Sequence, residues 1–252
     1  MLNMKNKKYT FGDVTFEVET PFELADKNNC SSFVTENETD YLIRITPTDS
    51  ESEIKEQIRR EGNVIRRFIK TKYAGSQNIA SILASSEAAF LFPKHDAFIL
   101  HASYIIIGRK AILFTAPSGT GKSTQARFWR DERGAEIVNG DRVLVTRRNG
   151  VFYANGIYAC GTSGICHNRT APIAAVILLE QGDENAQNKI ASRKLFLRIL
   201  CECSYDMKDL EQYEKITELV SDMINSLPTI CYRCKKSPEA VEALEKILWK
   251  KE

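Results

Sequence analysis

Apolar and polar residues alternate with period two in the first part of the chain, over YTFGDVTFEVE (residues 9–19) and DYLIRITPT (residues 40–48). Such alternation is typical of half-buried strands. The next segment, SESEIKEQIRREGNVIRRFIKTKY (residues 50–73), has charged residues at helical spacing and predicts a helix. Together these patterns predict an N-terminal α+β lobe over residues 1–93.

Stronger apolar runs begin at residue 97. AFILHASYIII and AILFT predict two strands joined by a turn at residues 108–110, and KSTQARFWRDE has a helical composition. GAEIVNGDRVLVTRRNGVFYANG (residues 134–156) predicts a strand, a tight break and a hairpin, with Asn149-Gly150 as the turn signal.

The last third of the chain alternates strands with helices. APIAAVILLEQ (residues 171–181) is apolar without interruption and predicts a strand buried on both faces. Helices are expected around residues 192–203, 210–225 and 237–249, and PTICYRC (residues 228–234) predicts one more strand. Residues 94–252 therefore read as an α/β core with a mixed sheet and flanking helices.

Composition and charge place the chain among globular proteins. Hydrophobic residues make up 43% of the 252 residues, enough for a substantial core. Lys and Arg number 35 against 33 Asp and Glu, so the net charge of +2 gives no reason to expect general attraction to nucleic acid or to a membrane surface. An anionic ligand would have to be held by a local site.

The N-terminal residues have no apolar run before a small-residue cleavage site, and no apolar stretch approaches the roughly 20 residues that span a bilayer. Seven cysteines without the spacing of small secreted domains suit a reducing compartment. We therefore expect a cytoplasmic protein.

The strongest chemical motif is APSGTGKST, residues 116–124, which fits the phosphate-binding pattern G-x-x-x-x-G-K-[ST] except that Ala116 replaces the first glycine. In this motif Gly119 and Gly121 allow backbone N–H groups to turn toward a phosphate. Lys122 supplies a positive charge, and Ser123 places a hydroxyl for Mg²⁺ at the start of a helix. Residues that bind nucleotide are thus expected to be Ser118, Gly119, Thr120, Gly121, Lys122, Ser123 and Thr124.

Asp141 is the first acid at the end of an apolar strand after this loop, 19 residues beyond Lys122. That spacing leaves room for one helix and one strand, so the carboxylate is expected beside the loop. There it could bind Mg²⁺ or accept a proton from an attacking hydroxyl. Asn-Gly-Asp is also an ordinary turn signal, which is the alternative interpretation.

LHASYIIIGRKAILFTAPSGTGKSTQARFW followed by GAEIVNGDRVLV resembles the superfamily of HPr kinase/phosphorylase and phosphoenolpyruvate carboxykinase-like proteins. The resemblance covers residues 97–188 best, and it implies a carboxykinase-like phosphate-loop core. It implies that His101 contacts the γ-phosphate or a second metal ion, and that His101, Asp141 and Lys122 are the catalytic residues. Gly140, however, stands where the family has the first of two paired acids, and the proline-glycine-arginine-asparagine element that accompanies HPr recognition is absent from the sequence. The resemblance is therefore to a branch other than the true HPr kinases.

The resemblance implies an ATP- and Mg²⁺-dependent kinase that transfers the γ-phosphoryl group to a hydroxyl, most simply a serine, of a peptide, small protein or small molecule. The alternative is a nucleotide-binding regulatory or accessory protein without turnover, which Ala116 and Gly140 would favour. Nucleotide-coupled decarboxylation is a third, weaker interpretation. The sequence leaves a homo-oligomeric assembly open.

Several polar residues between the hairpin and the next strand are weaker candidates. Thr162, Ser163 and Gly164 could line the same cleft, and Arg169 could contact phosphate or substrate. His167 lies in the same polar loop. Arg142 directly follows Asp141 and is expected to point to the opposite face of the strand.

Two cysteine pairs, Cys201/Cys203 and Cys231/Cys234, raise the question of a four-thiolate zinc site. The first pair falls in a helical stretch, where residues two apart do not share a face, and the second falls in a strand, where residues three apart point to opposite faces. Buried free thiols are the preferred interpretation.

Overall fold

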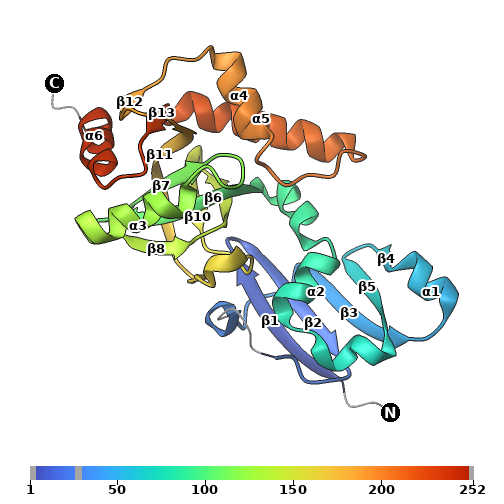
Figure 1. Ribbon diagram of the computed structural model, residues 1–252. Coiled ribbons are helices and arrows are strands. Elements are labelled where there is room, and N and C mark those ends of the chain that lie inside the picture. Colours follow the sequence, from blue (N-terminus) through green and yellow to red (C-terminus); the bar gives the residue numbers. More distant parts are fainter. Residues whose placement is uncertain (1–3, 26–29, 250–252) are drawn as a thin grey trace. The chain divides into compact units, whose positions relative to one another are not determined.

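The structure is a computed structural model that describes residues 4–25 and 30–249 (Figure 1). The chain divides into two compact units, Met1–Leu91 and Phe92–Glu252. Each unit contains one mixed sheet with its own helices, so the protein has a mixed α/β architecture.

The first unit contains a five-stranded sheet in the order β1-β2-β3-β5-β4. The predicted strands are present, the first stretch being a hairpin that turns at Gly12, whose φ is +60°. β2, β3 and β5 pair in parallel, and β1 and β4 are antiparallel edges. The elements of this unit are β1 (Lys5–Phe11), β2 (Val14–Thr20), η1 (Cys30–Phe33), β3 (Tyr41–Thr48), α1 (Glu51–Glu56), β4 (Ile58–Glu61), β5 (Val64–Lys70), η2 (Thr71–Ser76) and α2 (Ile79–Ser85).

The helix predicted over residues 50–73 is wrong. Only Glu51–Glu56 is α-helical, and the 3-10 helix η2 begins at Thr71. Residues 58–70 between them form the hairpin β4–β5, closed by the two-residue turn Gly62-Asn63 with Gly62 at φ +59°. A Gly-Asn turn favours a hairpin. β5 pairs with β3 as well as with β4, so tertiary pairing overrides the helical spacing of the charged residues.

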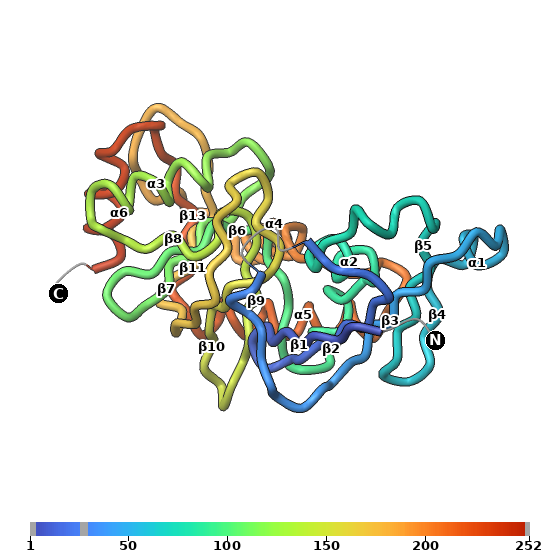
Figure 2. Tube along the Cα trace, turned by 90° about the horizontal axis from the view of Figure 1, so that it is seen from below, coloured from blue at the N-terminus to red at the C-terminus, as the bar shows by residue number. Residues whose placement is uncertain are grey.

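The second unit contains an eight-stranded sheet in the order β10-β9-β6-β7-β11-β13-β12, with β8 paired to β6. β10 also pairs with the beginning of β11, so five strands close a ring. The hairpin β9–β10, with its Asn149-Gly150 turn at positive φ, is confirmed and stands out in Figure 2. The elements are η3 (Ala88–His95), β6 (Ala97–Ile107), β7 (Lys110–Thr115), α3 (Lys122–Arg133), β8 (Glu136–Asn139), β9 (Arg142–Arg148), β10 (Val151–Asn155), η4 (Gly161–Ser163), β11 (Thr170–Gln181), β12 (Ala186–Gln187), α4 (Ser192–Leu200), α5 (Leu210–Ser226), β13 (Thr229–Cys234) and α6 (Glu239–Leu248).

Helices cover the sheet of the second unit on both faces (Figure 1). α3 and α6 enclose one apolar cluster around Phe114 and Trp129. α4 and α5 enclose the other, around Phe98 and Leu219. The middle of β11 lies between the two clusters, which confirms the strand predicted to be buried on both faces.

β7, β11 and β13 run parallel to one another, so their carboxyl ends lie at one edge of the sheet. The segments after these strands begin at Ala116, Gly182 and Lys235. Ligands of open α/β sheets bind outside the carboxyl ends of parallel strands. The fold therefore concentrates candidate binding residues at this edge.

No helix of residues 4–25 and 30–249 is long and apolar enough to cross a membrane.

Candidate functional site

The segment between β7 and α3 has the strand-loop-helix form that the phosphate-binding motif requires. Gly119 has φ +80° and Gly121, at the helix N-cap, has φ +116°, conformations that disfavour any residue with a Cβ. Ala116 lies outside this left-handed region, and its methyl group is buried in the cluster around Phe114. The missing first glycine therefore imposes no backbone strain on the loop.

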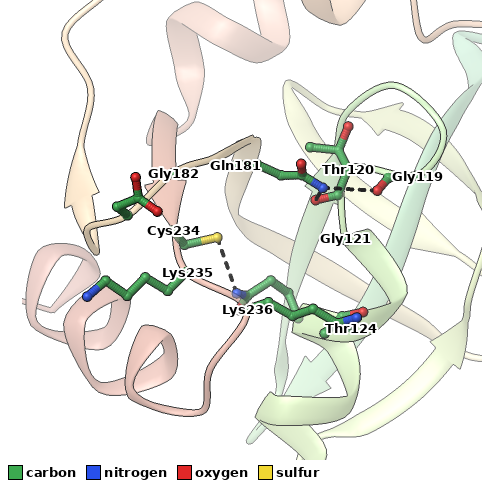
Figure 3. A pocket seen from close by; sticks show the side chains of 11 residues that line it. Gly119, Thr120, Gly121, Thr124, Gln181, Gly182, Cys234, Lys235 and Lys236 are labelled. Carbon is green, nitrogen blue, oxygen red and sulfur yellow. Dashed lines mark hydrogen bonds between the residues drawn. The ribbon is translucent and has the colours of Figure 1, made fainter.

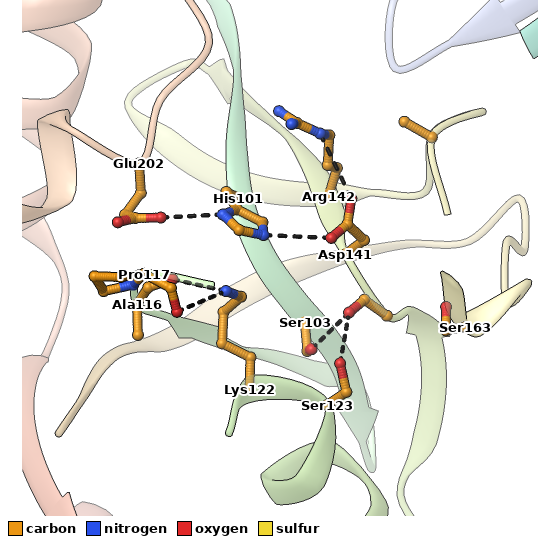
Figure 4. Close-up of polar contacts among 12 residues, drawn as sticks. His101, Ser103, Ala116, Pro117, Lys122, Ser123, Asp141, Arg142, Ser163 and Glu202 are labelled. Carbon is orange, nitrogen blue, oxygen red and sulfur yellow. Dashed lines mark hydrogen bonds and ion pairs between the residues drawn. The ribbon is translucent and has the colours of Figure 1, made fainter. Parts of the chain in front are cut away.

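Lys122 is a buried cation at the start of α3 (Figure 4). Its Nζ donates to the carbonyl oxygens of Ala116 at 2.7 Å and Pro117 at 3.3 Å, and no carboxylate of the described residues forms a direct ion pair with it. Burial lowers the pKa of the Lys122 ammonium, while the nearby carboxylates of Glu202 and Asp141 oppose that shift. A buried ammonium group bonded only to its own loop is suited to receive an anion.

Ser123 Oγ and Ser103 Oγ both donate to the carbonyl oxygen of Gly140, at 3.1 and 2.9 Å. These bonds hold the segment after β8 against the start of α3 and the middle of β6. They bring Asp141, the next residue, beside the phosphate loop, as expected from its spacing of 19 residues from Lys122.

Asn139 fixes this segment from within and was missed in the sequence. It is fully buried, its Oδ1 accepts from the backbone N–H groups of Asp141 and Arg142, and its Nδ2 donates to the carbonyls of Ile157 and Ala159. In the sequence, an ordinary Asn-Gly-Asp turn is the alternative to a site role for Asp141. The structure shows that the two interpretations are compatible. The turn is what orients Asp141.

His101 lies between two carboxylates. Its Nε2 is 3.3 Å from Asp141 Oδ1, and its Nδ1 is 3.1 Å from Glu202 Oε2 (Figure 4). The hydrogen bond from His101 is the main cause that lowers the pKa of Asp141, with further lowering by the charges of Arg142 and Lys122. Asp141 is therefore ionised at neutral pH, and its carboxylate could serve as an oxygen ligand.

Glu202 was also missed, because nothing in its spacing from the loop marks it. The segment that follows α4 adds to the edge of β6. The backbone N–H of His101 donates to Glu202 O, Leu100 forms a bridge with Cys203, and Ser204 N donates to Ile99 O. One short segment thereby fixes the Glu202 carboxylate on the His101 ring.

Arg142 does not point away from the site, so that prediction is wrong. Its Nη1 donates to Ser204 Oγ at 2.8 Å, and its Nε is 3.6 Å from Asp141 Oδ2. The long side chain bends back because Ser204 sits beside β6 and supplies an acceptor. Arg142 consequently adds a second positive group next to Asp141.

Gly140, at the position where the resemblance implies the first of two acids, is packed tightly. A Cβ at this position would lie 2.4 Å from Ser163 Oγ and 2.6 Å from Ser163 Cβ. A Cβ at Gly161, whose φ is +54°, would lie 2.7 Å from Asp141 Cγ. The short helix η4 therefore occupies the space that a second acid would need.

Gly140→Asp is expected to lower the free energy of unfolding by about 1–3 kcal/mol through overpacking. Combining it with Ser163→Gly should recover at least half of that loss, because the second change removes the clashing atoms. Thermal unfolding of wild type, both single variants and the double variant gives the coupling directly. Unchanged stability of Gly140→Asp would show that this position has free space.

A cavity of about 480 Å³ opens on the other flank of the loop (Figure 3). Gln181 Nε2 donates to the carbonyls of Gly119 at 3.2 Å and Thr120 at 3.4 Å, so the end of β11 is tied to the loop. Gln125 is buried, and its Oε1 has no hydrogen-bond partner among the described residues. The volume suits a nucleotide-sized ligand. The cavity is lined by Gly119, Thr120, Gly121, Thr124, Gln125, Gln181, Gly182, Asp183, Cys234, Lys235 and Lys236.

The weaker candidates are divided. Ser163 and its neighbour Thr162 belong to η4, which packs against Gly140 and Asp141. Arg169 instead pairs with Glu136 at 3.2 Å, at the opposite end of β8 from Asn139. His167 is an exposed residue whose backbone N–H donates to Val138 O.

The cysteines of the two pairs are free thiols. Cys231 lies near Arg198 of α4, whereas Cys234 accepts from Gln125 of α3, so the two point to opposite faces as predicted. α4 ends at Leu200, and Cys201 is exposed, which corrects the expectation that all four thiols are buried.

No family model matches the sequence, and no curated protein matches it. Among solved structures, the chain is similar to the HPr(Ser) kinase/phosphatase from Coxiella burnetii at 16% identity, over 59% of this chain and 94% of that one, with a TM-score of 0.33. A likeness this distant carries no argument about activity, so the function must be argued from the residues of the site itself.

Proposed function

We propose that this protein is an ATP- and Mg²⁺-dependent phosphotransferase that transfers the γ-phosphoryl group to a hydroxyl, most simply that of a serine. The observation that carries the proposal is the buried Lys122 ammonium, bonded only to the carbonyls of its own loop and flanked by the ionised Asp141. The Lys122 ammonium would bind phosphate, and the Asp141 carboxylate would bind a metal ion or accept a proton.

The donor set fits magnesium. Mg²⁺ prefers oxygen ligands and is commonly held by one or two carboxylates together with substrate phosphates. Asp141 offers a carboxylate and Ser123 a hydroxyl, and both are anchored through Gly140 and Asn139. When bound there, the ion would neutralise charge on the phosphates.

The roles of the protein groups follow from their positions. Ser118 to Thr124 would hold the phosphates with backbone N–H groups at the start of α3, and Lys122 would exchange its carbonyl partners for phosphate oxygens. Asp141 would orient the acceptor hydroxyl and take its proton. His101, held by Glu202, would keep Asp141 in place and steady the transferring group.

A regulatory protein without turnover is the second candidate, and Gly140 is the observation in its favour. One acid suffices for the proposed chemistry, because phosphoryl transfer depends mainly on positioning and charge neutralisation. Ala116 no longer supports the regulatory alternative, since it fits the loop without strain.

ATP labelled either in the γ-phosphate or in the adenine ring separates the two candidates. The purified chain with Mg²⁺ and serine-containing acceptors is expected to transfer the γ label and never the adenine label. Tight nucleotide binding without transfer or hydrolysis of the γ label would identify the regulator instead.

A further inference from the structure

A second cavity, of about 430 Å³, lies along the exposed side of α4 and meets the phosphate loop at Pro117. We call it the α4 groove, and define it by Pro117, Arg193, Lys194, Leu197, Cys201 and Glu202. It is separate from the cavity in Figure 3, with which it shares no residue.

The groove has an apolar floor and a basic rim. Leu197 is 46% exposed and Cys201 is also exposed, so apolar surface remains open there. Arg193 and Lys194 form no ion pair with any carboxylate of residues 4–25 and 30–249, whereas Glu202 is committed to His101. The free charge of the groove is therefore positive, which favours an occupant with apolar and acidic groups.

One end of the groove coincides with the candidate reacting groups. Pro117 O accepts from Lys122 Nζ, and Glu202 holds the ring of His101, which in turn contacts Asp141. The nucleotide-sized cavity approaches the loop from the α3 side and the groove approaches it from the α4 side. Two substrates could thus meet at Lys122 and Asp141.

We propose that the α4 groove binds the phosphoacceptor, and that the acceptor is a peptide segment with its hydroxyl residue at the Glu202 end, an apolar residue over Leu197 and an acidic residue at Arg193 and Lys194. This deepens the proposed function and rests on it for the transfer step. A peptide fits the shape of the groove, because its lining continues from the first turn of α4 to the residues beyond its end.

The dimensions set a spacing. Along α4, Lys194 and Leu200 are about 9 Å apart at a rise of about 1.5 Å per residue, and Glu202 lies two residues beyond the end of the helix, which brings the span to about 12 Å or slightly more. An extended peptide covers this distance in roughly four residues at about 3.3 Å each. The acidic residue should therefore lie three or four positions from the serine, with the apolar residue between them.

The test uses fluorescein-labelled peptides and the full chain, with binding followed by fluorescence anisotropy. One peptide has serine, leucine and aspartate at the inferred spacing, made in both chain directions. A second has lysine in place of aspartate, and a third has aspartate next to the serine. We expect the better direction of the first peptide to bind on the order of tenfold more tightly than the other two, as expected for two exposed charge pairs.

Arg193→Glu/Lys194→Glu should reverse the preference between the aspartate and lysine peptides. Arg109→Glu/Lys110→Glu is the matched control, because it makes the same change of charge at the opposite end of β7 and should leave the preference intact. Unchanged ATP affinity in both variants would show that the phosphate loop is undamaged.

Equal binding of the acidic and basic peptides, no peptide binding, or a preference that survives the Arg193/Lys194 reversal would overturn the groove assignment. Failure of the proposed function looks different. If the peptide binds with the expected preference but its serine receives no γ-phosphate, the groove is a peptide-binding site and the proposed kinase activity is wrong.

Discussion

Lys122→Ala is expected to weaken the binding of magnesium ATP by at least about a hundredfold. In the complex, Lys122 would pair with the phosphates of ATP. Removing one member of such a buried charge pair costs roughly 2–5 kcal/mol, and a hundredfold loss of affinity corresponds to about 2.7 kcal/mol. Lys122 is 6% exposed, so water would not replace the lost contact fully. Titration with a fluorescent ATP analogue measures the change.

Lys110→Ala is the matched control for this variant. Lys110 is exposed at the start of β7, far along the strand from the loop, and its removal should leave nucleotide affinity unchanged. Thermal unfolding of both variants tests whether the loss of the bonds from Lys122 to Ala116 and Pro117 disturbs the fold. A folded Lys122→Ala protein with wild-type affinity for ATP would show that this loop does not bind the nucleotide.

Asp141→Asn is expected to reduce phosphoryl transfer by about 10²- to 10⁴-fold, the range associated with loss of a positioned general base. The amide is nearly isosteric and keeps the backbone bond to Asn139, but it can neither take the proton nor supply a charged metal ligand. ATP affinity should fall by less than about tenfold, because the main interaction lost is one that Asp141 makes in the transition state and not in the ATP complex. Initial rates with γ-labelled ATP, paired with equilibrium titration, separate the two effects.

Asp131→Asn provides the comparison. Asp131 is an exposed residue of α3 that pairs only with the neighbouring Arg130 among the described residues, so its change should alter neither rate nor affinity. If Asp141→Asn retained full transfer activity, a different group would have to accept the proton.

The part of the site that sequence reasoning located is the part encoded locally. A phosphate loop needs consecutive residues with particular conformations, and Gly119, Gly121 and Lys122 reveal it in one short stretch. Asp141 was found because one helix and one strand separate it from the loop, a distance that spacing can estimate.

The missed residues depend on tertiary pairing. Glu202 reaches His101 only because the segment after α4 adds to the edge of β6, and no periodicity in the sequence announces that pairing. The same cause brings Arg142 to Asp141 through Ser204. In the first unit, β5 became a strand through its two neighbours, although its charged residues also satisfied helical spacing.

Gly140 changes meaning once the packing is known. The resemblance implies an acid at this position, whereas in the structure Ser163 fills the space that such an acid would need. A glycine at position 140 therefore allows η4 to pack beside Asp141. In the structure, the Asp141 carboxylate is contacted by both His101 and Arg142.

A crystal structure of the protein with Mg²⁺ and a non-hydrolysable ATP analogue tests the central claim most directly. We expect Lys122 Nζ to leave the carbonyl of Ala116 for the phosphates, the metal ion to be bound by Ser123 and Asp141, and the nucleoside to enter the cavity lined by Gln181 and Lys235. Nucleotide bound elsewhere, with Lys122 still donating to Ala116 and Pro117, would contradict it.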